Sequence, residues 1–413
     1  MSDESMSGHD SMSGHESPSN YGSMNPVDQT QSTTGHAPGW YADPWRMGPW
    51  RWWDGEAWTA HVSQAEESKP RLPAWLSVPV IIGLLATIIS MLLLLALSPG
   101  PTSYGIALGF VPLIIVMPVL SWLDRVEPEP RSSRIHALLW GGAVAGFVSG
   151  VVNSVVAVVS SEAWAAVVSA PLIEELMKGL GIIWALKRRE VDGVMDGIVY
   201  AGWVALGFAI IEDVLYFSNA AEQGILTQVF LLRAIFTPFA HPLFTAWTGL
   251  AIGLAVARQQ SVLANAFWGY GLAVASHAAW NGSLTYADET GNAAAIVIAA
   301  ACFVLLFFAA VVTVVLIRRD QQRKFTELIP MLAQRHSLTP EEVGVFGNWK
   351  RMLATRRATP RSKRAAFDRV HASLARLALF YRRVGTGDPA TEQLLANQLQ
   401  QARAAQFAAT AGQ

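Results

Sequence analysis

Long apolar segments alternate with short polar ones through the middle of the chain. From Ala74 onward, eight apolar spans come close to the ~20 residues that a helix needs to cross a bilayer. They cover roughly residues 74–97, 103–122, 136–160, 163–187, 194–218, 229–257, 262–284 and 293–317. Pro238 and Pro242 interrupt the sixth span, which predicts a kink or a preceding interfacial helix. The pattern predicts an all-α polytopic membrane protein with about eight transmembrane helices.

The segments outside these spans have different patterns. Residues 1–37 are rich in Ser, Gly and His and have few aliphatic side chains, which predicts a disordered tail. Residues 38–62 hold six of the sixteen tryptophans, and Asp54-Gly55 between aromatic runs is a typical hairpin turn. Residues 318–413 are polar with helical periodicity. We therefore expect a Trp-rich β module at 38–62, a membrane domain at 74–317 and a basic helical tail at 318–413.

Basic residues in the loops indicate an orientation in the membrane. Arg125, Lys187 and Arg258 follow the second, fourth and sixth spans, and Arg318 follows the eighth, whereas the intervening loops carry acidic residues. Short cytoplasmic loops are enriched in Lys and Arg. The distribution predicts that both termini are cytoplasmic, in what we expect to be a bacterial plasma membrane.

Composition excludes several classes of protein. The chain is 52% hydrophobic and only 15% charged, which argues against a soluble enzyme. Its single cysteine, Cys302, lies in the last apolar span, so a cysteine-based zinc site is not expected. Lys and Arg outnumber Asp and Glu in the tail after Arg318. This excess predicts contact with anionic lipid, and we expect no nucleic-acid binding because no such motif is present.

Ionisable residues lie inside four of the apolar spans, where each costs ~2.5–3.5 kcal/mol at the helix centre. They belong to the fourth to seventh spans and are Glu174, Glu175, Lys178, Glu212, Asp213, Arg233, His241 and His277. Counted inward at 1.5 Å per residue, Glu212 and His277 lie ~10 Å and Glu174 and His241 ~17 Å from the outer ends of their spans. We therefore expect a buried polar site in the outer half of the membrane or near its midplane.

Helical spacing indicates which of these side chains share a face. Glu174 and Lys178 are four residues apart, whereas Glu175 points ~100° away and is expected to pair elsewhere, with Arg233 as the candidate. His241, Thr245 and Gly249 follow one stripe, where the glycine permits close helix approach. His277 and Asn281 share a face. Asn153 and Asn265 are expected to form hydrogen bonds between helices.

Three roles fit such a buried set of charges. It can hydrolyse a bond with a carboxylate as general base, relay protons in a coupled transporter, or hold a non-catalytic scaffold together through ion pairs. The chain contains no HExxH metalloprotease motif and no GxSxG serine motif. The residues alone leave these three roles open.

Four short motifs on successive spans narrow the choice. They are Glu174-Glu175-Leu176-Met177-Lys178, Phe208-Ala209-Ile210-Ile211-Glu212, His241, and His277-Ala278-Ala279-Trp280-Asn281. In order and spacing this set resembles the PrsW family of intramembrane proteases, within the wider group of CAAX-protease-like membrane enzymes, over about residues 135–285. One departure is Asp213, where the family pattern has Asn.

The resemblance implies an intramembrane endopeptidase. By analogy, Glu174 is the general base, aided by Glu212 or His241, and His277 and Asn281 stabilise the oxyanion. Glu175 then shapes the site electrostatically together with Lys178. A zinc ion, if present, is expected at Glu212, His241 and His277. The implied substrates are single-pass membrane proteins such as membrane-anchored anti-sigma factors. The sequence does not indicate an oligomeric state.

Overall fold

The structure, a computed structural model, describes residues 38–42, 50–62, 76–188, 190–383 and 389–411. The predicted disordered tail at 1–37 lies outside these residues. The chain divides into two units, residues 1–68 and 69–413. Each unit is described by itself below.

The first unit contains the Trp-rich module as a small antiparallel sheet. Its three strands are ordered β1 (Gly39–Ala42), β2 (Trp50–Trp53) and β3 (Trp58–Val62). The predicted hairpin joins β2 to β3. Asp54 Oδ1 accepts hydrogen bonds from the backbone N of Glu56 and of Ala57 at 2.8 and 2.6 Å, and Gly55 takes a φ of +104° that suits glycine. The buried Trp53 packs edge-on against Trp58, so aromatic rings form the small core, as predicted.

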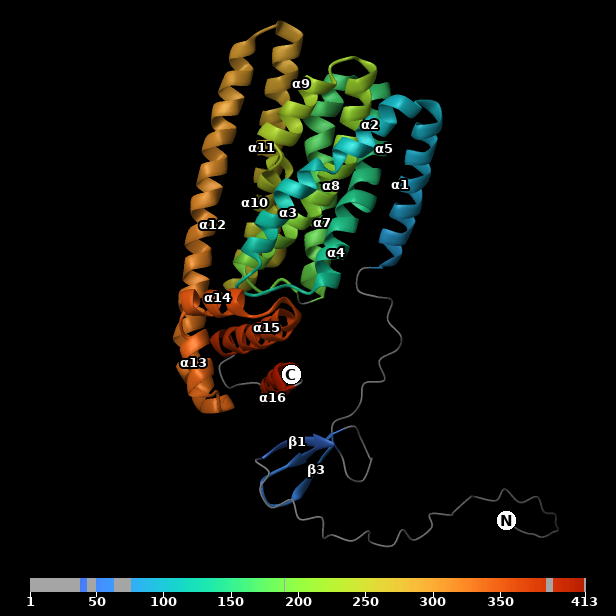
Figure 1. Cartoon of the computed structure of the whole chain (residues 1–413). Coiled ribbons are helices and arrows are strands. Elements are labelled where there is room, and N and C mark those ends of the chain that lie inside the picture. The colour runs from blue at the N-terminus through green and yellow to red at the C-terminus, as the bar shows by residue number, and fades with distance from the viewer. Residues whose placement is uncertain (1–37, 43–49, 63–75, 189, 384–388, 412–413) are drawn as a thin grey trace, which may run out of the picture. The chain divides into compact units, whose positions relative to one another are not determined.

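The second unit is a helical bundle followed by a helical tail (Figure 1). Its bundle helices are α1 (Val78–Leu97), α2 (Pro99–Gly109), α3 (Val111–Leu123), α4 (Arg131–Leu139), η1 (Trp140–Gly146), α5 (Phe147–Val159), α6 (Glu162–Trp164), η2 (Ala165–Ser169), α7 (Ala170–Lys187), α8 (Val194–Glu222), α9 (Leu226–Phe230), η3 (Leu231–Phe236), α10 (Ala240–Ala257), α11 (Val262–Thr290) and α12 (Ala293–His336). The segments η1, η2 and η3 are π-helical turns within longer helical stretches.

Six helical stretches of the described residues are long and apolar enough to cross a membrane. They are Val78–Leu97, Pro99–Leu123, Arg131–Val159, Val194–Glu222, Leu226–Ala257 and Ala293–His336. The other two predicted spans form the helices α7 and α11, which lie in the same bundle but carry site residues that make them more polar. The protein is therefore an all-α multi-pass membrane protein. The predicted interruption at Pro238 is also found, because η3 ends at Phe236 and α10 starts at Ala240.

Helix α8 forms the centre of the bundle, with nearly all of its apolar residues buried (Figure 1). Glycines bring its backbone directly against the neighbouring helices. A Cβ on Gly197 would lie 2.1 Å from the carbonyl oxygen of Gly249 on α10, and one on Gly207 would lie 1.9 Å from that of Leu138 on α4. The predicted close approach at Gly249 is thus present. This packing fixes α8 and α10 at a spacing that lets their polar side chains meet.

The tail is helical, as predicted, and has its own core. Helix α12 continues to His336 and is followed by α13 (Pro340–Phe346), α14 (Trp349–Ala358), α15 (Arg361–Arg383) and α16 (Pro389–Ala411). Phe367, Leu374 and Leu377 on α15 are buried against these helices. Arg318, also buried, donates hydrogen bonds to the backbone oxygens of Trp122 and Leu123 at the end of α3, which joins the tail to the bundle.

Candidate active site

Four helices bring their ionisable side chains together inside the bundle. Glu174, Glu175 and Lys178 come from α7, His241 from α10 and His277 from α11, and each is at least nine-tenths buried. Glu212 comes from α8 and is partly exposed. The predicted meeting of carboxylates and imidazoles inside the bundle is therefore found.

Glu175 is the anchor of this cluster. Its Oε1 accepts hydrogen bonds from Lys178 Nζ at 2.5 Å and from His277 Nδ1 at 3.1 Å, and its Oε2 accepts one from Thr245 Oγ1 at 2.8 Å. The predicted pairing of Glu175 with Arg233 is wrong. The 100° turn between Glu174 and Glu175 does not separate them, because the long Lys178 side chain reaches both carboxylates.

The hydrogen bonds assign one tautomer to each histidine. His277 donates from Nδ1 to Glu175, so its Nε2 carries a lone pair and lies 3.9 Å from Glu174 Oε2. His241 donates from Nε2 to Glu212 Oε2 at 2.6 Å, which leaves Nδ1 to accept from Lys178 Nζ at 3.3 Å. Each imidazole therefore has a carboxylate behind it and presents its other nitrogen to the interior of the cluster.

Among the described residues, Glu174 accepts a hydrogen bond on one oxygen, while Lys178 Nζ lies 3.8 Å from the other. Its Oε1 accepts a hydrogen bond from Asn153 Nδ2 at 3.2 Å, and Asn153 Oδ1 accepts one from Ser169 Oγ at 2.8 Å. Glu174 Oε2 is buried and has no hydrogen-bond partner in the described part of the chain. The predicted interhelical role of Asn153 is thus found. That of Asn265 is wrong, because its side chain bonds to Ser261 and Trp268 on or next to its own helix.

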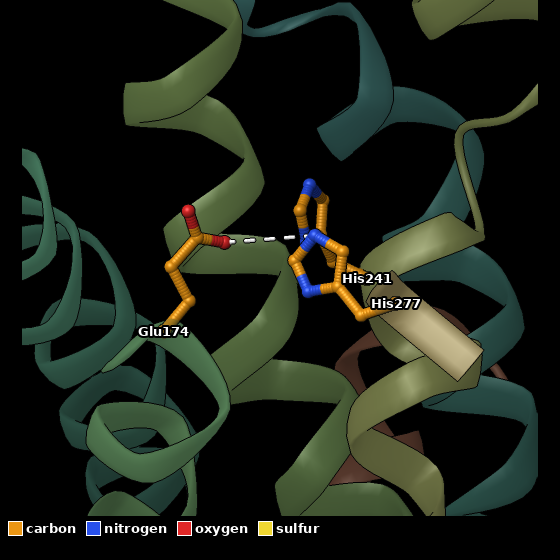
Figure 2. Close-up of side chains that lie close together, drawn as sticks. All are labelled: Glu174, His241 and His277. Atoms are coloured by element: carbon orange, nitrogen blue, oxygen red, sulfur yellow. Dashed lines mark ion pairs between the residues drawn. The ribbon is translucent and has the colours of Figure 1, made fainter. Parts of the chain in front are cut away.

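Glu174, His241 and His277 can share one metal ion (Figure 2). One ligand atom from each lies within 4.8 Å of the others. The unsatisfied Glu174 Oε2 and the two inward-facing imidazole nitrogens supply suitable donors, and a carboxylate behind each histidine is the usual arrangement around metal ligands. An ion bound by all three residues would replace the contact of Lys178 with His241. A possible His/Glu metal site is therefore present, with Glu174 in the place that the sequence assigned to Glu212.

Glu212 has a different set of partners from the one predicted. Arg233 on η3 donates one hydrogen bond to Glu212 Oε2 and another, from Nε at 2.5 Å, to Asp213 Oδ1. The Arg233 guanidinium also lies 3.9 Å from the centre of the Tyr216 ring. Asp213 thus accepts a hydrogen bond from an arginine. A carboxylate in this place forms a charge-assisted bond, which is stronger than the bond that a neutral asparagine amide would form. Glu212 as a metal ligand stays a prediction.

A cavity of about 170 Å³ opens onto one side of the cluster. Glu212, Arg233, His241 and His277 line it together with Asn281. Its wall also contains the polar side chains of Asp213, Tyr216 and Thr237 and a larger apolar set that includes Val229, Leu232, Phe244, Trp280 and Leu284. Asn281 Nδ2 donates to the backbone oxygen of Ala166 at 2.9 Å, so its amide is anchored at the cavity edge. The space admits a small group to the two histidines.

The sequence analysis did not predict that three further residues would bind the carboxylates of the site. Asn153 holds Glu174, Thr245 holds Glu175, and Arg233 holds Glu212 and Asp213. The signal for Arg233 was present, since an arginine in an apolar span needs a carboxylate partner and Asp213 had none assigned. No comparable signal exists for Thr245, which also suits a simple helix-packing position.

The comparisons with known proteins point to one family. Residues 129–316 match the family model described as PrsW family intramembrane metalloprotease, and residues 38–71 match a family described as a protein of unknown function. A Protease PrsW from Geobacillus kaustophilus is 32% identical over 155 residues, which cover 36% of this chain and 66% of that protein. A Protease PrsW from Clostridioides difficile is 30% identical over 151 residues, 35% of this chain and 63% of that protein.

A third relative, a Protease PrsW from Oceanobacillus iheyensis, is 37% identical over 86 residues, 20% of this chain and 37% of that protein. The chain thus spans just under two thirds, or less, of the length of these curated relatives. No solved structure matches the chain. The four motifs, their meeting in one buried cluster and these matches lead to one conclusion: residues 129–316 of the chain are similar to the PrsW family of intramembrane proteases.

Proposed function

We propose that this protein is an intramembrane endopeptidase that hydrolyses peptide bonds of membrane-anchored proteins. One observation carries the proposal above all others. A cavity inside the apolar bundle reaches His241, His277 and Glu212, and hydrogen-bonded carboxylates lie behind both imidazoles. Hydrolysis needs a place where water and a carbonyl group meet polarising and proton-accepting side chains, and this arrangement supplies one.

Each group of site residues has its own role in the proposed reaction. Glu212 lines the cavity and bonds to His241, so these two can take up the proton of an attacking water and pass it to the leaving amine. Asn281 and His277 lie at the same cavity and are the candidates for stabilising the oxyanion. Lys178 offsets the charge of Glu174 and Glu175 in the buried interior.

The metal, where one is bound, is proposed to be zinc at Glu174, His241 and His277. Two histidines and one glutamate are a common protein ligand set of catalytic zinc sites. A zinc ion supplies Lewis acidity, which polarises a carbonyl and promotes loss of a proton from water. Glu174 cannot serve at the same time as ligand and as the general base that the sequence predicted.

The location and partners belong to the same proposal. Loop charges support a bacterial plasma membrane with both termini in the cytoplasm, and helix depth supports a site nearer the outer side. Single-pass proteins, anti-sigma-factor-like regulators among them, are then the expected substrates. The basic tail is expected to contact anionic lipid.

The test compares cells carrying the wild-type protein with cells carrying Glu174→Gln or Glu175→Gln at equal abundance. New N- and C-termini of membrane-protein fragments are mapped by mass spectrometry, and the metal content of each purified protein is measured. We expect fragments of a single-pass protein to disappear with Glu174→Gln. Loss of zinc along with activity assigns Glu174 as a ligand, and loss of activity with zinc retained assigns it as the base.

Identical fragment maps for the wild type, Glu174→Gln and His277→Ala would overturn the protease proposal. Proton-coupled uptake into vesicles would then test the transporter alternative. Intact folding without either activity would support the scaffold alternative.

A further inference from the structure

The side chain of Lys178 reaches the candidate metal ligands that Figure 2 shows, from one helical turn after Glu174 on α7. Its Nζ lies 3.3 Å from His241 Nδ1 and 3.8 Å from Glu174 Oε2. These are the two atoms that His241 and Glu174 can offer to a metal ion. Lys178 is fully buried, so its positive charge is held next to the metal position with little water around it.

Lys178 and a metal ion need the same lone pair of His241. The Nε2 of this imidazole donates to Glu212, so the lone pair of the neutral ring is on Nδ1. That lone pair accepts the hydrogen bond from Lys178 Nζ. It cannot bind a metal ion and accept this hydrogen bond at the same time. A metal ion on His241 Nδ1 therefore has to displace Lys178 from that atom.

The charges of Lys178 and of a metal ion also oppose each other. The ammonium group is within 4 Å of two of the three candidate ligand side chains, so it and a divalent cation would share one small buried space. Like charges repel more strongly in such a space than in water. Lys178 has an alternative partner, because its Nζ also donates to Glu175 Oε1 at 2.5 Å and lies 4.3 Å from the centre of the Phe208 ring. It can leave His241 and keep these two contacts.

Lys178 balances the same negative charges that a metal ion would balance. Glu174 and Glu175 are both buried, and Lys178 forms an ion pair with each of them. Glu175 also accepts hydrogen bonds from Thr245 and His277. A buried carboxylate that loses its cation destabilises the fold strongly. Lys178 thus supplies a positive charge to the site that does not depend on a metal.

We propose that Lys178 competes with the metal ion and takes its electrostatic role whenever no metal is bound. The proposal rests on the metal site of the proposed function. Without metal, the ammonium group binds His241 and offsets the charge of Glu174, and the bundle stays folded. When a metal binds, it takes over both contacts and Lys178 keeps its bond to Glu175. The wild-type protein therefore gives up part of its metal affinity in exchange for stability without metal.

The test measures zinc affinity and thermal unfolding of the full-length protein in detergent. Zinc affinity is measured by competition with a fluorescent chelator, and unfolding is followed with zinc bound and after removal of zinc by EDTA. Lys178→Gln removes the charge but keeps a hydrogen-bond donor for Glu175, and Lys178→Met removes both. We expect each variant to bind zinc about tenfold more tightly than the wild type, or tighter still, because a like charge is gone. Since a ligand that binds the folded state stabilises it, removal of zinc should lower the unfolding temperature of each variant more than that of the wild type.

The matched control is Lys187→Gln, which removes an exposed lysine at the end of the same helix. It should leave both the zinc affinity and the effect of EDTA unchanged. Equal or weaker zinc binding by the two Lys178 variants, the same gain with Lys187→Gln, or Lys178 variants that are unfolded even with zinc would each refute the competition. None of these measurements uses cleavage. If neither the wild type nor the variants bind zinc, this inference fails, while the fragment maps still test peptide-bond hydrolysis separately.

Discussion

Among single residues, Asn153 tests how strongly the site depends on the orientation of Glu174. Its amide is the hydrogen-bond donor to Glu174 Oε1, and Ser169 fixes the amide in turn. Removing a residue that orients a catalytic or ligating group typically costs 10–100-fold in activity or metal affinity. We expect Asn153→Ala to lower the cleavage rate of a reconstituted substrate about 10–100-fold without loss of folded protein.

The control for Asn153 is Asn265→Ala. The Asn265 side chain is partly exposed, as that of Asn153 is. Its hydrogen bonds go to Ser261 and Trp268, on or next to its own helix and away from His277. It should leave the cleavage rate unchanged. An Asn153→Ala protein that cleaves at the wild-type rate would show that Glu174 holds its orientation without this bond.

Residue identities in the site were more predictable than their partners. Glu174, Glu212, His241 and His277 stand out because ionisable groups in apolar spans are costly and need a reason. Helical spacing then gives the direction of each side chain about its own axis. It does not give the order of the helices around the site, which is why Arg233 was matched to Glu175 and not to Glu212 and Asp213.

Among the short elements, η3 is joined to α8 by hydrogen bonds of the Arg233 side chain. Its guanidinium holds Glu212 and Asp213, and η3 also forms part of the cavity wall. Arg233→Gln leaves two adjacent carboxylates without this cation. Loss of one partner of a fully buried ion pair costs ~3–5 kcal/mol, and the partial exposure of Arg233 and Glu212 makes the cost smaller here. We expect this variant to unfold at a clearly lower temperature in detergent and to lose cleavage. Thermal unfolding and the cleavage assay measure the two effects.

Asp213→Asn is the matched comparison for Arg233→Gln. It removes one carboxylate, restores the amide of the family pattern and leaves the bond between Arg233 and Glu212 in place. Its effect on stability should be much smaller. An Asp213→Asn protein as unstable as Arg233→Gln would show that Asp213, not Glu212, carries the attachment of η3.

Helix packing around α8 gives a second prediction about elements. A Cβ on Gly141 of η1 would lie 1.8 Å from the carbonyl oxygen of Val204 on α8, so a methyl group there must force two backbones apart. Overpacking of this kind costs ~1–3 kcal/mol or more. Gly141→Ala should therefore lower the unfolding temperature. Gly150→Ala on α5, where a Cβ meets nothing within 4 Å, should leave it unchanged or raise it slightly. Equal effects would contradict the close contact.

The elements themselves were largely predictable. Each of the eight apolar segments forms helix, because a long apolar segment in a bilayer must satisfy its backbone hydrogen bonds internally. The interruption at Phe110 between α2 and α3 and the π-helical turns were not predicted. These features depend on how a helix packs against its neighbours, for example at Gly141 against α8. The pattern of apolar residues along the chain does not predict that packing.

For the whole molecule, the sequence predicted a Trp-rich module, a membrane domain and a helical tail. It did not predict the contacts between the membrane domain and the tail. Periodicity at Phe367 and Leu374 indicated a helix with a buried face, and the structure supplies the core that buries it. Nothing in the pattern indicated that Arg318 would be buried against the end of α3, or that a cavity would form beside α10. Contacts between distant segments decide both features.

The tail core also makes the stability of the whole molecule depend on pH. His371 on α15 is buried beside Phe325, Phe346 and Trp349, and none of the described residues forms a hydrogen bond with its Nε2. Burial lowers the pKa of His371 from 6.5 to about 4, while Asp368 raises this pKa and Arg356 and Arg125 lower it. The folded tail therefore holds a neutral imidazole that becomes protonated on unfolding in mildly acidic solution.

The sign of the effect follows from where the proton binds. Between pH 6.5 and about 4 the unfolded tail binds more protons than the folded tail, so its stability is full above pH 6.5 and falls as the pH drops through this range. The total loss from this group is ~3 kcal/mol. Hydrogen-exchange protection of α15 amides in the full-length protein, corrected for the intrinsic pH dependence, measures it. His371→Phe keeps the aromatic packing and removes the titration, so its protection should fall less steeply. Equal slopes for the two proteins would show that groups other than His371 govern the acid response of the tail.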